Sequence, residues 1–278
     1  MKCFYHKADL DGISSAAYVN MMYPNCELIG VDYGEDYSKI LGSIDIDERV
    51  WVVDFTFEPI KIMQSIAKKG DLFWFDHHLS SIEYAKELKA SFQGSIGKAD
   101  NKQSTIALLY DYFKIGRYST PNLPTIEMIS LFDTWQWKEH QNADLIHAFN
   151  VGAMNILSLD PEDRAKWRSL FQHPIGVEGL DLIQQCIKTG YILIEYLKQN
   201  NEQNMSHSSF NFKYKQYQFL CLNTALKGSL QFESKWNPEI HDAMIAFYYL
   251  NNKWRYSMYT DKPNVDILKI ATYFGGGG

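Results

Sequence analysis

The stretch Leu72-Phe73-Trp74-Phe75-Asp76-His77-His78 decides the fold of this chain. Its four apolar residues, three of them aromatic, predict a buried strand. An acid and two imidazoles follow at the carboxyl end of that strand. Open α/β sheets bind their ligands at the carboxyl ends of the strands. The stretch therefore predicts a site at one edge of a sheet, to which other strand ends must contribute.

Acidic and histidine residues also stand at the ends of other apolar stretches. They are His6-x-x-Asp9-x-Asp11-Gly12, Asp54 and Asp133. The first set follows a predicted strand at 2–5, Asp54 lies in the strand predicted at 49–55, and Asp133 follows the apolar residues 128–132. Strand ends of a parallel sheet face the same edge, so the first set, Asp54 and Asp76-His77-His78 are expected to converge. Asp133 is a fourth candidate, with the end of a helix as its alternative interpretation.

Strands and short helices alternate along the first part of the chain. Strands at 2–5, 27–31, 49–55 and 72–75, with helices at 13–22 and 59–69 between them, indicate βαβ units and a largely parallel sheet. Further helices are predicted at 104–113, 125–132, 144–152, 161–171 and 176–207. Strand pairs at 210–214 and 217–223 and at 243–250 and 254–259, then a helix at 264–274, form the last part.

This pattern predicts an α/β protein with two domains. A mainly parallel domain at 1–175, which carries the predicted site, is expected to continue through a helical connector at 176–207 into a smaller α/β domain at 208–278. The active cleft is expected between the two lobes.

Composition limits the classes of partner. The chain has 278 residues, 46% of them hydrophobic, and a formal net charge of -6, which argues against a protein that coats long nucleic acid. It contains no apolar run of the roughly 18 residues that a membrane span needs and no signal-peptide pattern at its start. A cytoplasmic protein is expected, with its four scattered cysteines reduced and buried.

Clustered negative charge predicts metal ions. Asp9, Asp11, Asp54 and Asp133 could not gather at one edge without compensating positive charge. Two divalent cations, in the arrangement that clamps a phosphate and activates water, would supply it. Imidazole and carboxylate ligands without thiolate favour Mn²⁺, with Mg²⁺ or Co²⁺ as alternatives.

The motifs in this order resemble the DHH phosphoesterase superfamily. That superfamily includes RecJ-type exonucleases, nano-RNases that act as oligoribonucleases, pAp phosphatases, cyclic-dinucleotide phosphodiesterases and, more distantly, family II inorganic pyrophosphatases. Residues 254–259, 266–271 and 274–278 are similar to the DHHA1 substrate-binding domain. In that family a histidine and a small-residue segment follow the glycine run. Either the natural chain continues past Gly278, or its substrate loop is incomplete.

The resemblance implies a role for each matching residue. One metal would be held by His6, Asp9 and Asp54, and the other by Asp11, Asp54, His77 and Asp133. With Asp54 and His77 as catalytic ligands, His78 would contact the scissile phosphate, and Asp76 would orient a ligand histidine. The expected substrate contacts in the last domain are Arg255, Ser257, Lys227-Gly228-Ser229 and Gly275, Gly276, Gly277 and Gly278.

The implied activity is a Mn²⁺-dependent hydrolase that cleaves phosphodiester bonds of short oligonucleotides or linear dinucleotides, with water between the metals as nucleophile. A pAp-type phosphomonoesterase or a polyphosphate hydrolase on the same residues is the alternative within enzymes. A non-catalytic nucleotide-binding protein is the alternative of another class. The sequence leaves open whether the chain forms a homodimer.

Overall fold

The computed structural model describes residues 1–87, 103–114, 124–157, 159–171, 177–226 and 228–276. The chain divides into two compact units, Met1–Leu193 and Ile194–Gly278, and each is described by itself.

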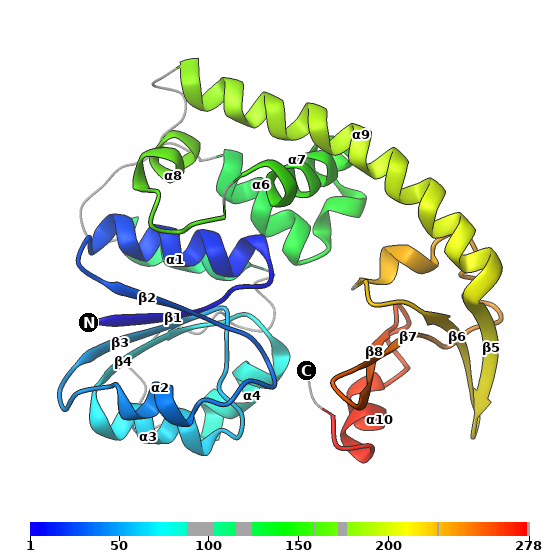
Figure 1. Ribbon diagram of the computed structural model, residues 1–278, viewed down its shortest axis with the longest axis horizontal. Helices are drawn as coiled ribbons and strands as arrows, with labels where there is room; N and C mark the ends of the chain where they lie inside the picture. The colour runs from blue at the N-terminus through cyan, green and yellow to red at the C-terminus, as the bar shows by residue number, and fades with distance from the viewer. Residues whose placement is uncertain (88–102, 115–123, 158, 172–176, 227, 277–278) are drawn as a thin grey trace. The chain divides into compact units, whose positions relative to one another are not determined.

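Unit 1 is built on a four-stranded parallel sheet (Figure 1). Its strands are β1 (Lys2–His6), β2 (Glu27–Val31), β3 (Arg49–Val53) and β4 (Asp71–Phe75), in the order β2-β1-β3-β4. All three neighbouring pairs are parallel, with Tyr5 opposite Val53 and Val53 opposite Phe75. The predicted α/β fold with a parallel sheet is confirmed, and every strand of this sheet ends at the same edge.

Helices cover both faces of this sheet (Figure 1). On one face lie α2 (Ser38–Gly42), α3 (Lys61–Lys69) and α4 (Leu79–Glu87). On the other lies α1 (Leu10–Met22), which packs against α5 (Thr105–Lys114), α6 (Pro124–Asp133), α7 (Ala143–Ile156) and α8 (Arg164–Phe171). A 3-10 helix, η1 (Gln136–Glu139), follows α6. Fully buried Phe4, Val52, Met63 and Trp74 belong to one core cluster, which fixes the strands from which the site residues emerge.

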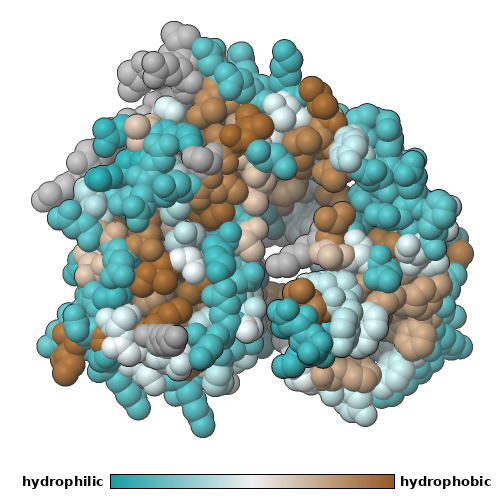
Figure 2. Space-filling model, in the orientation of Figure 1, coloured by the Kyte–Doolittle hydropathy of each residue, from teal (hydrophilic) through white to brown (hydrophobic). Residues whose placement is uncertain are grey.

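The long helix α9 (Val177–Ser208) touches α7 backbone to backbone. A Cβ atom at Gly152 would lie 1.7 Å from the carbonyl oxygen of Cys186, and one at Gly190 would lie 1.8 Å from that of Ala148. Only glycine allows this approach at both positions. The later part of α9 is polar, and it forms a teal band in Figure 2.

Unit 2 contains a mixed four-stranded sheet in the order β5-β6-β7-β8. Its elements are β5 (Ser209–Tyr214), β6 (Tyr217–Asn223), the 3-10 helix η2 (Ser229–Phe232), β7 (Ala243–Leu250), β8 (Lys253–Tyr259) and α10 (Ile267–Tyr273). The predicted tight turn between β7 and β8 is confirmed, because Asn251 and Asn252 have φ values of 51° and 60°. The predicted start of the last helix was wrong: Asp266 accepts a hydrogen bond from the Lys269 N–H and caps the helix there.

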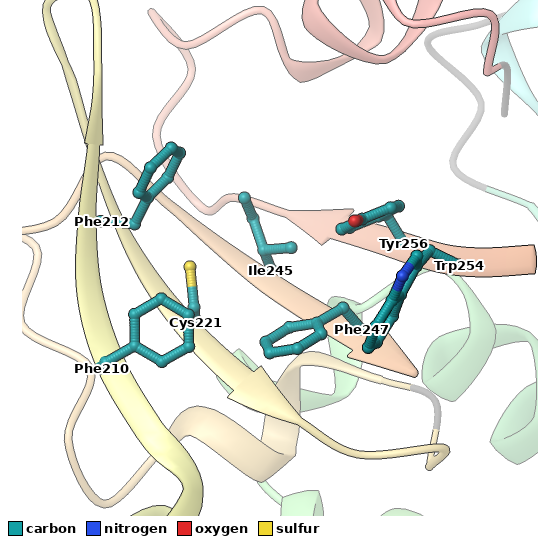
Figure 3. Close-up of a pocket in the computed structure, with 7 residues that line it drawn as sticks. All are labelled: Phe210, Phe212, Cys221, Ile245, Phe247, Trp254 and Tyr256. Carbon is teal, nitrogen blue, oxygen red and sulfur yellow. The ribbon is translucent and has the colours of Figure 1, made fainter. Parts of the chain in front are cut away.

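One face of this second sheet carries a hollow lined largely by aromatic rings (Figure 3). It measures about 300 Å³ and is lined by Phe210, Phe212, Cys221, Ile245, Phe247, Trp254 and Tyr256. These residues share a face because strand side chains alternate and the register aligns Phe210 with Cys221 and Phe247 with Tyr256. Phe210 and Trp254 remain about half exposed.

All four cysteines are buried and free, as predicted. No helix in the described part of the chain is long and apolar enough to cross a membrane.

Candidate metal centre

The carboxyl edge of the parallel sheet gathers the residues that the sequence singled out. His6 ends β1, Asp54 directly follows β3, and Asp76-His77-His78 directly follows β4. Asp133 reaches the same place from the end of α6, where its Oδ2 lies 2.8 Å from His77 Nε2. The convergence follows from the parallel pairing of the strands.

A first group of possible ligands consists of His6, Asp9 and Asp54. His6 Nδ1 lies 2.8 Å from Asp9 Oδ2 and 3.7 Å from Asp54 Oδ2. Asp9 has a second task, because its Oδ1 accepts the Gly12 N–H at 3.0 Å and caps α1. Gly12 lets α1 start in contact with β1: a Cβ there would lie 2.1 Å from the His6 carbonyl oxygen. The Asp9 side chain therefore links the start of α1 to the first ligand group, so that one fixes the position of the other.

A second group consists of Asp11, His77 and Asp133, and a third of Asp54, His77 and His78. His77 Nε2 is common to both: besides Asp133, it faces Asp54 Oδ1 at 3.5 Å and Asp11 Oδ2 at 3.9 Å. In each of the three groups the ligand atoms lie within 4.8 Å of one another. Such spacing suits side chains that surround a common ion.

Asp54 joins the two sides of the centre. Its carboxylate is 1% exposed, with Oδ2 on the His6 side and Oδ1 on the His77 side. Its backbone has a φ of 54°, in the left-handed region that residues with a side chain rarely adopt. Such conformations gather at functional sites, where the surrounding structure holds them. This backbone bend turns the carboxylate toward both groups.

The electrostatics of the centre favour positive charge. Burial lowers the pKa of His6, but Asp54 and Asp9 outweigh it and raise this pKa to about 11. Burial likewise lowers the pKa of His77, while Asp133 and Asp54 raise it to about 12. Burial and the Asp54 carboxylate raise the pKa of Asp9 to about 6. Protons and metal ions would therefore compete for the same ligands.

Divalent metal ions fit these residues. Several buried atoms have no hydrogen-bond partner among the described residues: both ring nitrogens of His6, Nε2 of His77 and Oδ2 of Asp133. Their short distances to neighbouring ligand atoms therefore lack hydrogen-bond geometry. Buried polar atoms without partners are rare in folded proteins. Imidazole and carboxylate donors aimed at common points are typical of a divalent metal site.

Asp76 and His78 form a polar network that adjoins the centre, because His78 also belongs to the third group of possible ligands. The buried Asp76 accepts hydrogen bonds from Thr56 Oγ1 at 2.9 Å, Ser81 Oγ at 2.7 Å and the His78 N–H at 3.0 Å. Its Oδ1 also lies 2.6 Å from His78 Nδ1. Burial lowers the pKa of His78, but Asp76 outweighs it and raises this pKa to about 9. Asp76 thus orients His78, rather than the predicted ligand His77, and stabilises the protonated form of its ring.

Sequence reasoning missed several residues of the centre. Ser104 and Thr105 contact Asp11 from the start of α5, and Asp32, at the end of β2, lies 3.4 Å from His6 Nε2. Asp32 stands after a strand like Asp54, so the same strand-end signal could have found it. Thr56 and Ser81 carry no comparable signal.

The predicted substrate residues belong to unit 2. Arg255 and Ser257 lie on one face of β8, and Gly275 and Gly276 follow α10. Arg255 and Ser257 face away from the aromatic hollow, because Trp254 and Tyr256 line it. Lys227, Gly277 and Gly278 lie outside the described residues. Substrate contact through this set stays a prediction.

The comparisons with known proteins bear on the fold. The sequence matches no family model and no curated protein. Its structure is similar to a pGpG-specific phosphodiesterase, PggH, from Vibrio cholerae, with a TM-score of 0.53, 13% identity and coverage of 100% of this chain and 90% of that one. It is also similar to the DHH domain of a member of the S1p family of ribosomal proteins, with a TM-score of 0.55, 11% identity and coverage of 99% and 77%. The chain therefore has the fold of DHH-domain proteins, as the resemblance of its motifs predicts.

Proposed function

We propose that this protein is a metal-dependent phosphoesterase, with Mn²⁺ as its preferred ion, that cleaves phosphodiester bonds of short oligonucleotides or linear dinucleotides. The arrangement of Asp54 supports the proposal best. One buried carboxylate faces two opposed sets of imidazole and carboxylate ligands at the carboxyl edge of a parallel sheet. That arrangement suits two divalent ions sharing one ligand.

Each residue has a task in this proposal. His6, Asp9 and Asp54 would hold one ion, and Asp11, Asp54, His77 and Asp133 the other. The bound ions would supply Lewis acidity and lower the pKa of water near the phosphate. His78, with one ring nitrogen held by Asp76, would donate from the other nitrogen to a phosphate oxygen or to the leaving oxygen. Its side chain is 40% exposed and thus open to a substrate.

Short nucleotide substrates are favoured for two reasons. The net charge of -6 offers no strong electrostatic attraction for a long polyanion. One structural neighbour is described as specific for pGpG, a linear dinucleotide. Residues of unit 2, Arg255 and Ser257 among them, would hold the rest of the substrate. The protein would act in the cytoplasm, either as a single chain or as a homodimer.

A substrate panel with Mn²⁺ tests the proposal. We expect release of mononucleotides from linear dinucleotides, measured by chromatography, and slower or no reaction with pAp, cyclic dinucleotides and polyphosphate. Release of orthophosphate from pAp or polyphosphate without dinucleotide cleavage would replace the proposal by the phosphomonoesterase or polyphosphate alternative. Nucleotide binding without turnover of any substrate would identify a non-catalytic binding protein.

An Asp-to-Asn pair tests the centre itself. Asp54→Asn removes the shared charge and is expected to lower turnover at least 100-fold, because both ligand groups lose a carboxylate. Asp47→Asn is the matched control: Asp47 also has a positive φ, of 61°, but it is exposed and precedes β3 at the opposite end of the strand. Equal activity of the two variants would refute the assignment of Asp54.

A further inference from the structure

The start of α5 is fixed to Asp11 by three hydrogen bonds. Asp11 Oδ1 accepts Ser104 Oγ at 2.8 Å and the Ile106 N–H at 3.0 Å, and its Oδ2 accepts the Thr105 N–H at 2.8 Å. All of these groups are fully or almost fully buried. Hydrogen bonds to a buried carboxylate are strong, so the first turn of α5 has little freedom relative to α1.

This anchoring brings a hydroxyl group to the shared carboxylate. Thr105 is fully buried, and its Oγ1 donates a hydrogen bond of 3.2 Å to Asp54 Oδ1. The same oxygen faces His77 Nε2 at 3.5 Å, while Oδ2 faces His6. The Thr105 hydroxyl therefore restrains rotation of the Asp54 carboxylate. This rotation determines which of the two carboxylate oxygens faces each ligand group.

We propose that Thr105 is a positioning residue of the metal centre: its hydroxyl holds the Asp54 carboxylate in the rotation that lets it serve both ligand groups. Asp11 contributes to the metal centre in two ways. Its hydrogen bonds place Thr105 beside Asp54, and its own carboxylate adds negative charge. The inference rests on the proposed function, because it assumes that these groups bind metal. Thr105 lies outside the ligand motifs, and its role is to orient a ligand and not to bind the ion.

Loss of the hydroxyl should weaken metal binding without removing a ligand. A carboxylate that loses such a hydrogen bond can rotate, and residues that orient metal ligands typically change metal affinity about 10–100-fold when they are substituted. Thr105→Val keeps the shape of the side chain but not its hydroxyl. Thr105→Ser keeps the hydroxyl.

Calorimetric titration with MnCl₂ provides the measurement, and electron paramagnetic resonance reports magnetic coupling between two bound Mn²⁺ ions. We expect Thr105→Val to bind Mn²⁺ at least tenfold more weakly and to lose the coupled signal. Thr105→Ser should stay within about threefold of the wild type. Thr125→Val is the matched control: Thr125 is also buried, but its hydroxyl donates to the Leu170 carbonyl oxygen at 2.8 Å, so only stability should change.

The outcomes separate this inference from the proposed function. If the wild type does not bind Mn²⁺, the proposed metal-dependent function is wrong, and the role of Thr105, which rests on it, is wrong as well. If the wild type binds two ions and Thr105→Val binds them equally well, with the coupled signal intact, Thr105 has no positioning role and only the inference fails. Equal losses in Thr105→Val and Thr125→Val would also overturn it, because they would reveal a general effect of removing a buried hydroxyl.

Discussion

Gly12→Ala should damage the fold and the metal centre together. The added Cβ would lie 2.1 Å from the His6 carbonyl oxygen and 2.8 Å from the His6 Cβ, whereas ordinary contacts begin at 3.4 Å. The start of α1 must therefore retreat from β1 by more than about 1 Å, since backbone cannot rotate away as a side chain can. Overpacking of this kind costs about 1–3 kcal/mol, against at most about 1 kcal/mol that alanine returns in helix propensity.

We expect the free energy of unfolding to fall by about 2 kcal/mol in urea denaturation. Misplacement of catalytic groups by about 1 Å can cost roughly 100-fold in rate, so turnover should fall more than stability alone explains. Gly42→Ala is the control, because nothing lies within 4 Å of its added Cβ, and it should leave both quantities near the wild type. A Gly12→Ala protein with wild-type stability and turnover would refute the close contact between α1 and β1.

Three further predictions follow from the charges and contacts. Since the pKa values of His6 and His77 are raised to about 11 and about 12, both rings are protonated at neutral pH, and metal binding requires them neutral. Mn²⁺ affinity at each site should rise with pH by up to about tenfold per unit, with about two protons released in calorimetry across buffers when both sites fill; release of none would contradict the ligand assignment. Gly190→Ala should lower the free energy of unfolding by about 2 kcal/mol, because its Cβ would lie 1.8 Å from the Ala148 carbonyl oxygen while alanine returns some helix propensity; an unchanged urea midpoint would show that α7 and α9 can move apart without loss of stability. Burial raises the pKa of Glu48, but the N-terminal amine and Lys2 outweigh it and lower this pKa to about 2. The contribution of Glu48 to the free energy of unfolding is therefore present above about pH 4.5 and is lost as pH falls toward 2. Glu48→Gln should cost about 1–2 kcal/mol at pH 7 and less at pH 2, and a loss independent of pH in acid denaturation would exclude the charge effect.

The site residues at the carboxyl edge of the parallel sheet could be predicted from the sequence, because the pattern that identifies them is local. Each strand is a short apolar run, and the residue after it carries the chemistry, as in Phe75-Asp76 and Val53-Asp54. Parallel pairing then brings these ends together without further information. The apolar run before Asp133 marks it as a candidate, but Asp133 ends helix α6, so parallel strand pairing does not explain its place at this edge.

The contacts that orient the ligands could not be predicted in this way. Ser104, Thr105 and Ile106 meet Asp11 across 93 to 95 residues of chain, and nothing in their local pattern specifies that partner. The same holds for the contact of Gly190 with Ala148. Local patterns specify elements, whereas such pairings depend on how the elements pack.

The left-handed backbone at Asp54 has an evolutionary consequence. Most side chains are strained at a φ of 54°, whereas Asn and Gly tolerate it, and each is one base change from an Asp codon. A lineage that gave up metal binding could therefore keep the bend after β3 almost without cost. If the proposed function is correct, Asn or Gly at this position in an otherwise intact fold would identify a relative that has lost metal-dependent cleavage.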